Sequence, residues 1–444
     1  MNVRRRSFIR YASLAAAGNL LGLRPFGALN ALAGTQPDYK ALVCIFLYGG
    51  NDANNMVVPF DTKGYANYSS IRADLALAQN TLLPLTPLPN FALHPSLPDV
   101  QSLFNNGNAA IVANVGTLTQ PTTRTAYLAG SSVPVNLFSH PDQQEEWQNA
   151  SQDSSVSTGW AGRMSDVLAG SYNSGASIPM ITSVAGDTLF CNGVSTTPVS
   201  VSPGNVAGAA CSEGAECAAR LSSAQTLISY ASGVSLVTQD NHITSNAYSY
   251  AATLTAATQS VTPLKTVFPT GGLGAQLQQI AQIIQVRAAL GVQRQIFFCG
   301  IGNFDTHSDQ LPLQAALLSG ISPALSAFYN ATVEMGVQSN VTSFTMSDFA
   351  RTFQPNSNTG SDHAWGSHHI VFGGAVKGGQ MYGTYPTLAL GGPDDSGSNG
   401  RWVPSTGSVQ YAATLASWFG VPAAALATVF PNIGNFATTN LGFV

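Results

Sequence analysis

The histidines of this chain gather in a few short segments, together with several aspartates. Five of the seven histidines fall in three such segments: His140, His307, His363, His368 and His369. Asp305 and Asp362 stand beside them, and Asp52 ends an earlier apolar run. Carboxylates and neutral imidazoles are the ligands of Zn²⁺, Mn²⁺ or a mixed dinuclear site. The residue types therefore predict a metal centre, if the fold brings these segments together.

Most of these polar segments follow apolar runs that we predict to be strands. Runs that are apolar on both faces are typical of buried parallel strands, and they span residues 40–48, 111–115, 178–184, 295–300, 341–346 and 370–374. Apolar residues at helical spacing predict helices over 276–290, 311–335 and 411–419. Strands that alternate with helices predict an α/β fold with a mostly parallel central sheet, covered by helices on both faces. Because ligands of such sheets bind beyond the carboxyl ends of the strands, the polar segments are expected to meet there.

Residues of about 186–272 break this alternation. They are rich in Ser, Thr, Gly and Ala, and we interpret them as an insertion or cap on one domain that spans 34–444. Of the five cysteines, Cys44 and Cys299 lie inside apolar runs and are predicted to be buried thiols. A Cys211–Cys217 disulfide fits an oxidising compartment, although spacing alone does not fix the pairing.

The charge balance limits the partners. Charged residues make up only 9% of the 444 residues, and all 21 Asp and Glu lie beyond residue 34. Five of the 17 Lys and Arg precede that point, so the remainder of the chain is clearly acidic. An acidic surface argues against nucleic acid or anionic lipid as the main partner. We also find no apolar run long enough to span a bilayer.

The first 33 residues resemble a twin-arginine export signal. Arg5 and Arg6 form the pair, and Phe8 and Ile9 follow as its apolar couple. A modest apolar stretch at 11–23 leads to Ala-Leu-Ala at 31–33, which is a small-x-small cleavage pattern. We therefore expect the twin-arginine translocase as a partner during export, and a periplasmic or secreted protein. A basic arm on a cytosolic protein is the alternative interpretation.

Several motifs occur in an order that resembles the DUF1501 family of exported bacterial proteins. They lie at 46–52, 139–147, 159–163, 303–307, 347–352, 361–368 and 373–379. The most specific are Asp-His-Ala-Trp-Gly at 362–366 and Gly-Gly-Ala-Val-Lys-Gly-Gly at 373–379. This family is similar to a branch of the alkaline phosphatase superfamily, which also holds sulfatases and cofactor-independent phosphoglycerate mutases. The resemblance implies an alkaline-phosphatase-like fold.

The resemblance also implies roles for the candidate residues. One metal (Zn, Mn or Ca) would be held by Asp52, Asp362 and His363, and Ser139 at the start of a helix would be the nucleophile on it. A second metal would be held by Asp305, His307 and His368. These three residues depart from the superfamily spacing, so one ion is favoured over two, and both numbers stay open.

The implied chemistry is in-line attack on phosphorus or sulfur by the Ser139 hydroxyl or by water. Arg163 and the helix N-terminus would hold the equatorial oxygens, and His140 would act as general acid or base if the second metal is absent. Some of these residues also have a purely structural interpretation: Asp52 as a turn former and Ser139 as a helix cap. For Asp348, metal binding and an ion pair with Arg351 are the two alternatives, and the ion pair is favoured.

Two classes of function follow. The first is an exported, metal-dependent hydrolase of phosphate or sulfate esters, acting on a small-molecule or polymer substrate. The second is a non-catalytic exported envelope protein, for adhesion or assembly, that keeps the fold. The density of His and Asp at strand ends favours the first class.

Overall fold

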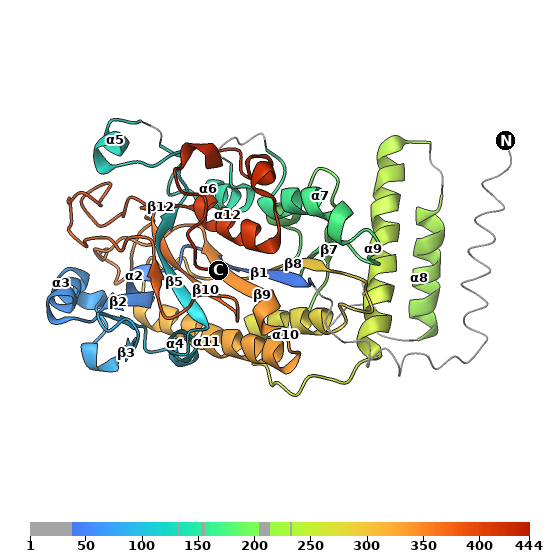
Figure 1. The fold of residues 1–444 in the computed structure, drawn as a ribbon, viewed down its shortest axis with the longest axis horizontal. Coiled ribbons are helices and arrows are strands. Elements are labelled where there is room, and N and C mark those ends of the chain that lie inside the picture. The colour runs from blue at the N-terminus through green and yellow to red at the C-terminus, as the bar shows by residue number, and fades with distance from the viewer. Residues whose placement is uncertain (1–37, 132, 152–155, 204–213, 231–232) are drawn as a thin grey trace. The chain divides into compact units, whose positions relative to one another are not determined.

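A mixed sheet runs through the centre of the molecule (Figure 1). The computed structural model describes residues 38–131, 133–151, 156–203, 214–230 and 233–444, and within these ranges the sheet has nine strands. Their order is β11-β5-β10-β9-β1-β8-β6-β7, with β12 paired to β5. The strands are β1 (Lys40–Leu47), β5 (Ala109–Gly116), β6 (Ile181–Ser183), β7 (Val199–Ser200), β8 (Arg294–Ile301), β9 (Val341–Ser347), β10 (Ser367–Phe372), β11 (Met381–Tyr382) and β12 (Thr406–Gly407).

Strand direction decides which chain segments share an edge of this sheet. β1 lies between β8 and β9 and is parallel to both, so all three strands end at the same edge. β10 is antiparallel to β9 and to β5. The chain therefore enters β10 at the edge where β1, β8 and β9 end, and β5 ends there too. The segments after β1, β8 and β9 and the segment before β10 meet at one rim.

Helices cover both faces of the sheet (Figure 1). One face packs against α4 (Pro98–Asn105), α10 (Gly272–Gln285) and α11 (Gln310–Glu334), and the other packs against α6 (His140–Asn149), α7 (Trp160–Tyr172) and α12 (Ser408–Phe419). Because successive side chains of a strand point to opposite faces, Val43 and Ile45 of β1 join the first core and Cys44 and Phe46 join the second.

Shorter elements complete the domain. β2 (Val57–Pro59), β3 (Leu83–Pro84) and β4 (Phe91–Leu93) form a small antiparallel sheet, near α2 (Ala53–Met56) and α3 (Thr62–Arg72). α5 (Arg124–Leu128) precedes α6, and α13 (Leu426–Val429) follows α12. By length and composition, one described helix, α11, could cross a membrane; here it packs against α10 and α4.

The region of 186–272 contains β7, α8 (Ala215–Ile228) and α9 (Ser235–Gln259). β7 adds to the edge of the main sheet beside β6, so this part of the range is not separate from the core. α8 contacts α9, and α9 contacts α10 and β7 (Figure 1). No described residue of α8 is buried, whereas Ala251 and Leu254 of α9 are buried.

The predicted α/β class is confirmed, and the predicted strands and helices all occur with small shifts of their ends. The antiparallel β10 is the main departure from a parallel sheet. Cys44 and Cys299 are buried free thiols, as is Cys191. The export segment 1–33 and Cys211, the expected partner of Cys217, lie outside the described residues.

Candidate metal centre

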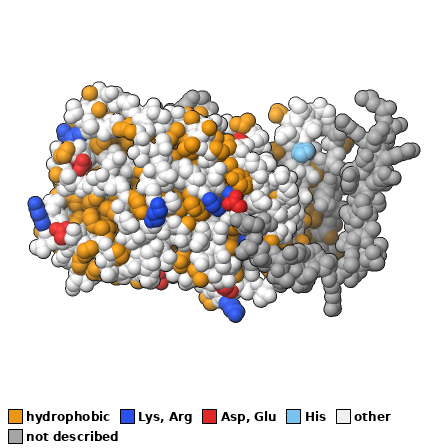
Figure 2. All heavy atoms as spheres, viewed as in Figure 1, with side chains coloured by type: hydrophobic (Ala, Val, Ile, Leu, Met, Phe, Trp, Pro, Cys, Tyr) orange, Lys and Arg blue, Asp and Glu red, His pale blue; other side chains and the backbone are white. Residues whose placement is uncertain are grey.

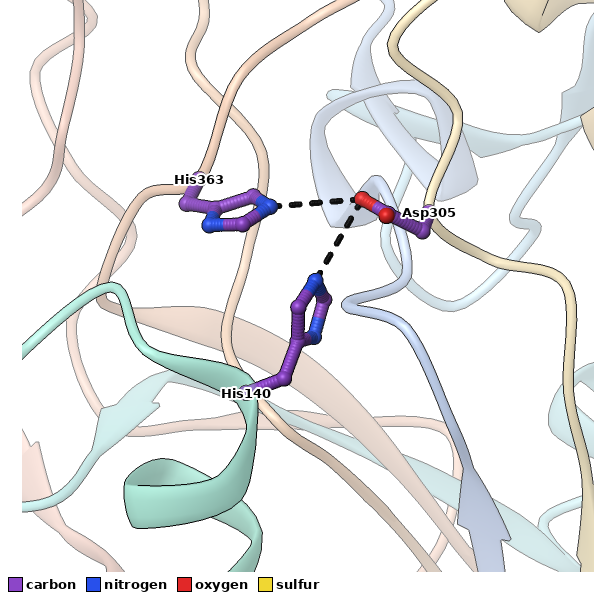
Figure 3. Close-up of side chains that lie close together, drawn as sticks. All are labelled: His140, Asp305 and His363. Atoms are coloured by element: carbon purple, nitrogen blue, oxygen red, sulfur yellow. Dashed lines mark hydrogen bonds and ion pairs between the residues drawn. The ribbon is translucent and has the colours of Figure 1, made fainter.

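Three segments place their histidines and an aspartate together at the carboxyl edge of the sheet. Asp305 and His307 lie on the loop after β8, and His363 lies just before β10. His140 is the first residue of α6. Figure 3 shows the imidazoles of His140 and His363 turned toward the Asp305 carboxylate.

The Nε2 atoms of all three imidazoles face the same carboxylate oxygen. Asp305 Oδ1 lies 3.0 Å from Nε2 of His307, 3.3 Å from Nε2 of His363 and 3.5 Å from Nε2 of His140. The His140 Nε2 atom is shielded from solvent and has no hydrogen-bond partner among the described residues. Ligand atoms of His140, Asp305 and His363 all lie within 4.8 Å of one another, as one ion would require. His307 is not part of that group, although its Nε2 atom contacts the same Asp305 oxygen.

The opposite nitrogen of each ring is held by an acceptor. The Nδ1 atoms pair with Asp348 Oδ2 at 2.7 Å for His140, with Asp362 Oδ1 at 3.0 Å for His307, and with the Phe138 carbonyl oxygen at 2.7 Å for His363. Carbonyl and carboxylate oxygens only accept hydrogen bonds, so Nδ1 carries the proton in each case and the Nε2 atom of a neutral ring presents a lone pair. Acceptors behind metal-ligating imidazoles fix the ring in this way.

The rings of His307 and His363 would repel each other without a positive charge between them. Nε2 of His307 lies 2.9 Å from Nε2 of His363, and two lone pairs at that distance are unfavourable. A shared proton or a cation bound to both nitrogens removes the repulsion. A nitrogen-rich donor set with one carboxylate suits Zn²⁺ better than Mn²⁺ or Ca²⁺, which prefer oxygen ligands. The residues present therefore fit a divalent metal.

A buried arginine, Arg351, forms an ion pair with the Asp305 carboxylate. The Arg351 guanidinium contacts Asp305 Oδ1 and the carbonyl oxygens of Gly49, Gly50 and Ser361. Partial burial by itself would raise the pKa of Asp305, but Arg351 together with the nearby histidines lowers it to about 2. Asp305 thus stays ionised, as a metal ligand must be.

The pKa values of the neighbouring Asp362 and His363 are also shifted. Partial burial opposes ionisation of Asp362, but hydrogen bonds from Asn356 and His307 lower its pKa. Burial and the Arg351 charge lower the pKa of His363, which favours the neutral ring. Asp305 and Asp362 are each nearly half exposed, at 45% and 46%, so the cluster is open to a ligand from solvent.

Asp52 lies in a different place from these groups. Its carboxylate is buried and forms an ion pair with Arg72. It also accepts from Gln310 Nε2 and, at 3.0 Å, from the Asn54 amide at the start of α2. These partners occupy the carboxylate on both oxygens. The structure therefore does not bring Asp52 into the His140–Asp305–His307–His363 cluster.

The two other predicted catalytic residues have local partners. Ser139 precedes α6, and its hydroxyl donates to Asp142 Oδ2. Arg163 is buried, and its guanidinium donates to the carbonyl oxygens of Val429, Thr158 and Asn149. Arg163 therefore links α7 to neighbouring backbone segments. The side chains of Ser139 and Arg163 do not contact the cluster.

His368 lies inside β10 and points elsewhere. Its Nδ1 accepts from the Asn114 amide at 3.0 Å, and its ring stacks on Tyr385 at 4.7 Å. Burial lowers the pKa of His368 to about 3. The predicted second metal set is thus divided: Asp305 and His307 join His140 and His363, whereas His368 does not.

Two functional contacts were missed at the level of sequence. Arg351 pairs with Asp305, so the expectation that it pairs with Asp348 is wrong. Asp348 instead accepts hydrogen bonds from His140, from the side-chain amide of Gln144 at 2.8 Å and from the backbone amide of Gly49 at 3.1 Å. Its position directly after β9 was a signal for a place at this edge, but no local pattern indicates its partner.

The protein therefore belongs to the class of α/β proteins, with a cluster of histidines and an aspartate at the carboxyl edge of its mixed sheet. Comparison with known protein families gives a more specific assignment. The chain belongs to DUF1501, described as a protein of unknown function, whose family model matches residues 39–395. The predicted family is therefore confirmed.

Solved structures similar to this chain come from several proteins. The lipoteichoic acid synthase LtaP from Listeria monocytogenes is 9% identical with a TM-score of 0.35, over 90% of this chain and 78% of that chain. The PsFucS1 sulfatase from Pseudoalteromonas sp. is 9% identical with a TM-score of 0.32, over 82% and 67%. A variant of alkaline phosphatase PafA is 12% identical with a TM-score of 0.27, over 72% and 64%. No curated protein sequence matches the chain.

Proposed function

We propose that this protein is a metal-dependent hydrolase of phosphate or sulfate esters, with one divalent cation held by His140, Asp305, His307 and His363. The observation that carries the proposal is the convergence of three Nε2 atoms on Asp305 Oδ1, each ring being held through Nδ1 by an acceptor. The choice of ester follows the family resemblance stated above. Compared with the expectation from sequence, His140 changes from a general acid or base to a ligand, and Asp362 changes from a ligand to the acceptor that orients His307.

A bound divalent cation supplies Lewis-acid polarisation of water and of an ester oxygen. The chain's own residues prepare the centre for it. Asp348 and Asp362 fix two imidazoles with Nε2 facing the centre, and Arg351 holds the Asp305 carboxylate in its ionised form. This fixed geometry removes reorganisation that the reaction would otherwise require.

Arg401 is the residue that we assign to the charged oxygens of the ester, in place of Arg163. Its Nε donates to the His363 carbonyl at 2.9 Å, and its guanidinium lies 4.4 Å from the Phe138 ring centroid. Its Nη atoms have no hydrogen-bond partner within the part of the chain that the structure describes. A guanidinium with free donors beside the centre suits phosphate or sulfate, which it binds through paired hydrogen bonds.

Export by the twin-arginine translocase belongs to the same proposal. The sequence of residues 1–33 supports it, and the acidic remainder of the chain supports a substrate other than nucleic acid. We place the protein in the periplasm or outside the cell, acting on a small-molecule or polymer ester.

Elemental analysis of the protein, purified without added metal, tests the centre directly. We expect about one equivalent of a transition metal or its uptake on titration, with a loss of at least about tenfold in affinity for His363→Ala and His307→Ala. His242→Ala, an exposed histidine on α9, is the matched control and should bind as the wild type does. Titration with Zn²⁺, Mn²⁺ and Ca²⁺ identifies the ion, and turnover of aryl phosphates and aryl sulfates identifies the ester.

The non-catalytic envelope protein remains the second candidate, because Ser139 and Arg163 have local partners instead of contacts with the centre. A wild type that binds none of the three ions and shows no turnover would support that candidate. Metal-dependent turnover that survives Ser139→Ala would leave the hydrolase proposal intact and remove Ser139 as its nucleophile.

A further inference from the structure

A cavity with no part in the metal centre opens at the same edge of the sheet, beside β5. It is lined by Asn114 and by residues 122–125, 384–386, 391–394 and 403–405, and has a volume of about 540 Å³. That volume lies within the range that small-molecule sites occupy. β5 is the neighbour of β10, so the cavity lies close to the segment that supplies His363.

His368, one of the predicted metal ligands, does not line this cavity but contacts two residues that do. His368 holds the Asn114 amide at 3.0 Å and stacks on Tyr385, which also lines the cavity. The Asn114 side chain donates to the Val403 carbonyl at 2.9 Å. Asn114 also has a positive φ of 50° within a strand, a conformation that costs free energy in residues other than glycine and is often found at functional sites.

Two polar atoms in the lining have no hydrogen-bond partner among the described residues. They are Asn114 Oδ1 and Thr122 Oγ1, both shielded from solvent. Asn114 as a whole is only 2% exposed. Both atoms are enclosed by protein, and Asn114 Oδ1 faces Gly366. A ligand in the cavity would instead meet the hydroxyl groups of exposed lining residues such as Thr125 and Thr384.

The chemistry of the lining selects a neutral ligand. Arg124 donates to the carbonyl oxygens of Asp395 and Gly397, and Asp394 accepts from the Thr387 amide. The lining thus holds one charge of each sign, with both groups already bonded. The rest is mainly threonine and serine hydroxyls interleaved with proline faces, Pro386, Pro393 and Pro404.

We propose that this cavity binds a neutral, hydroxyl-rich organic ligand such as a sugar ring. The hydroxyl groups of the lining pair with the ligand's hydroxyl groups, and the proline faces pack against its C–H groups. That this ligand is the organic part of the hydrolysed ester is a further step, which rests on the proposed function. Binding in the cavity itself does not require the metal.

Saturation-transfer NMR and calorimetry with neutral sugars test the proposal, using glucose, galactose, N-acetylglucosamine and maltose as probes. Thr384→Trp places a large side chain in the cavity at an exposed position, and Thr387→Trp is the matched control outside the lining. We expect at least one sugar to bind the wild type and Thr387→Trp equally, and Thr384→Trp at least about tenfold more weakly. Absence of binding to the wild type, or equal binding to Thr384→Trp, would overturn the proposal.

Two further arms separate this proposal from the hydrolase proposal. Thr125→Val removes only an exposed hydroxyl of the lining and serves if Thr384→Trp does not fold. Weaker sugar binding is expected, and unchanged binding counts against the site. His363→Ala disrupts the metal centre and should leave sugar binding unchanged. Sugar binding by a protein that shows no metal uptake would therefore support the cavity while the hydrolase proposal fails.

Discussion

Arg351 is a buried cation that contacts three segments around the candidate metal centre. It contacts the carbonyl oxygens of Gly49 and Gly50 after β1, the Ser361 carbonyl before β10, and Asp305 after β8. The Arg351 side chain is fully buried, so removing it leaves the three carbonyl oxygens without this donor, whereas the half-exposed Asp305 keeps access to water. The same residue thus supports both the fold and the charge state of Asp305.

For Arg351→Met we expect a loss of about 3 kcal/mol in the free energy of unfolding, because three carbonyls and a carboxylate lose their donor. Urea unfolding followed by circular dichroism measures this change. Lys63→Met, at an exposed position on α3, is the control and should change stability by less than about 0.5 kcal/mol. Equal stability of the two variants would show that Arg351 is dispensable for the fold.

Glu146 on α6, which is not part of the candidate metal centre, makes the folding stability depend on pH. Burial raises its pKa to about 8, although hydrogen bonds from Thr117 and Gln143 act in the opposite direction. The folded protein therefore holds a proton on Glu146 that the unfolded chain releases at lower pH. Folding stability contributed by this group is present at acidic pH and is lost as the pH rises toward 8.

The variant Glu146→Gln keeps the neutral, hydrogen-bonding form at every pH. We expect it to match the wild type near pH 4 and to exceed it at pH 8 by on the order of a few kcal/mol. Unfolding midpoints measured across this pH range provide the test. A constant difference between the two proteins would mean that Glu146 titrates normally.

Among the elements, the turn after β1 sets the distance between β1 and the loop that carries Asp305. Gly49 has a φ of 111°, and a Cβ atom at this position would lie 2.5 Å from the Asp305 amide nitrogen. The loop after β8 therefore packs directly against the turn, and only glycine permits this approach.

Gly49→Ala should displace Asp305 and weaken metal binding by at least about tenfold, an effect comparable to loss of an outer-shell partner. Gly186→Ala is the matched control, since Gly186 also has a positive φ of 82° but a Cβ atom at that position would meet nothing within 4 Å. Isothermal titration with the metal identified by the elemental analysis compares the two. Similar losses in both variants would point to backbone strain alone, without displacement of Asp305.

Across the molecule as a whole, the surface carries little charge. Only 9% of residues are charged, and on the face shown in Figure 2 the Lys, Arg, Asp and Glu side chains are few and scattered. Uncharged polar and apolar side chains cover most of that face. This face lacks a basic patch of the kind that nucleic acid requires.

Replacement of Arg5 and Arg6 by lysine tests the proposed route out of the cytosol. A twin-arginine signal should lose export when both arginines are changed, whereas a basic N-terminal arm keeps its charge and its behaviour. Cell fractionation followed by immunoblotting measures the distribution. Arg24→Lys, beyond the apolar stretch, is the control; unaltered export of the double variant would exclude this signal.

The strands, the class of fold and the edge at which the polar residues lie could all be predicted from the order of the amino acids. These features are local: an apolar run with a polar end predicts both a buried strand and the position of its last residues. The shared direction of β1, β8 and β9 agrees with the same pattern, and this is why Asp305, His307 and His363 were found as candidates.

Which of the candidates meet could be learned only from the folded chain. Asp52 follows β1 as Asp348 follows β9, yet the Asp52 carboxylate pairs with Arg72 of α3, whereas Asp348 pairs with His140. His368 lies five residues after His363 but inside β10, where the strand turns its ring toward Asn114 and Tyr385. The partner of each side chain depends on packing between segments that are far apart in the chain, and local residue patterns contain no information about that packing.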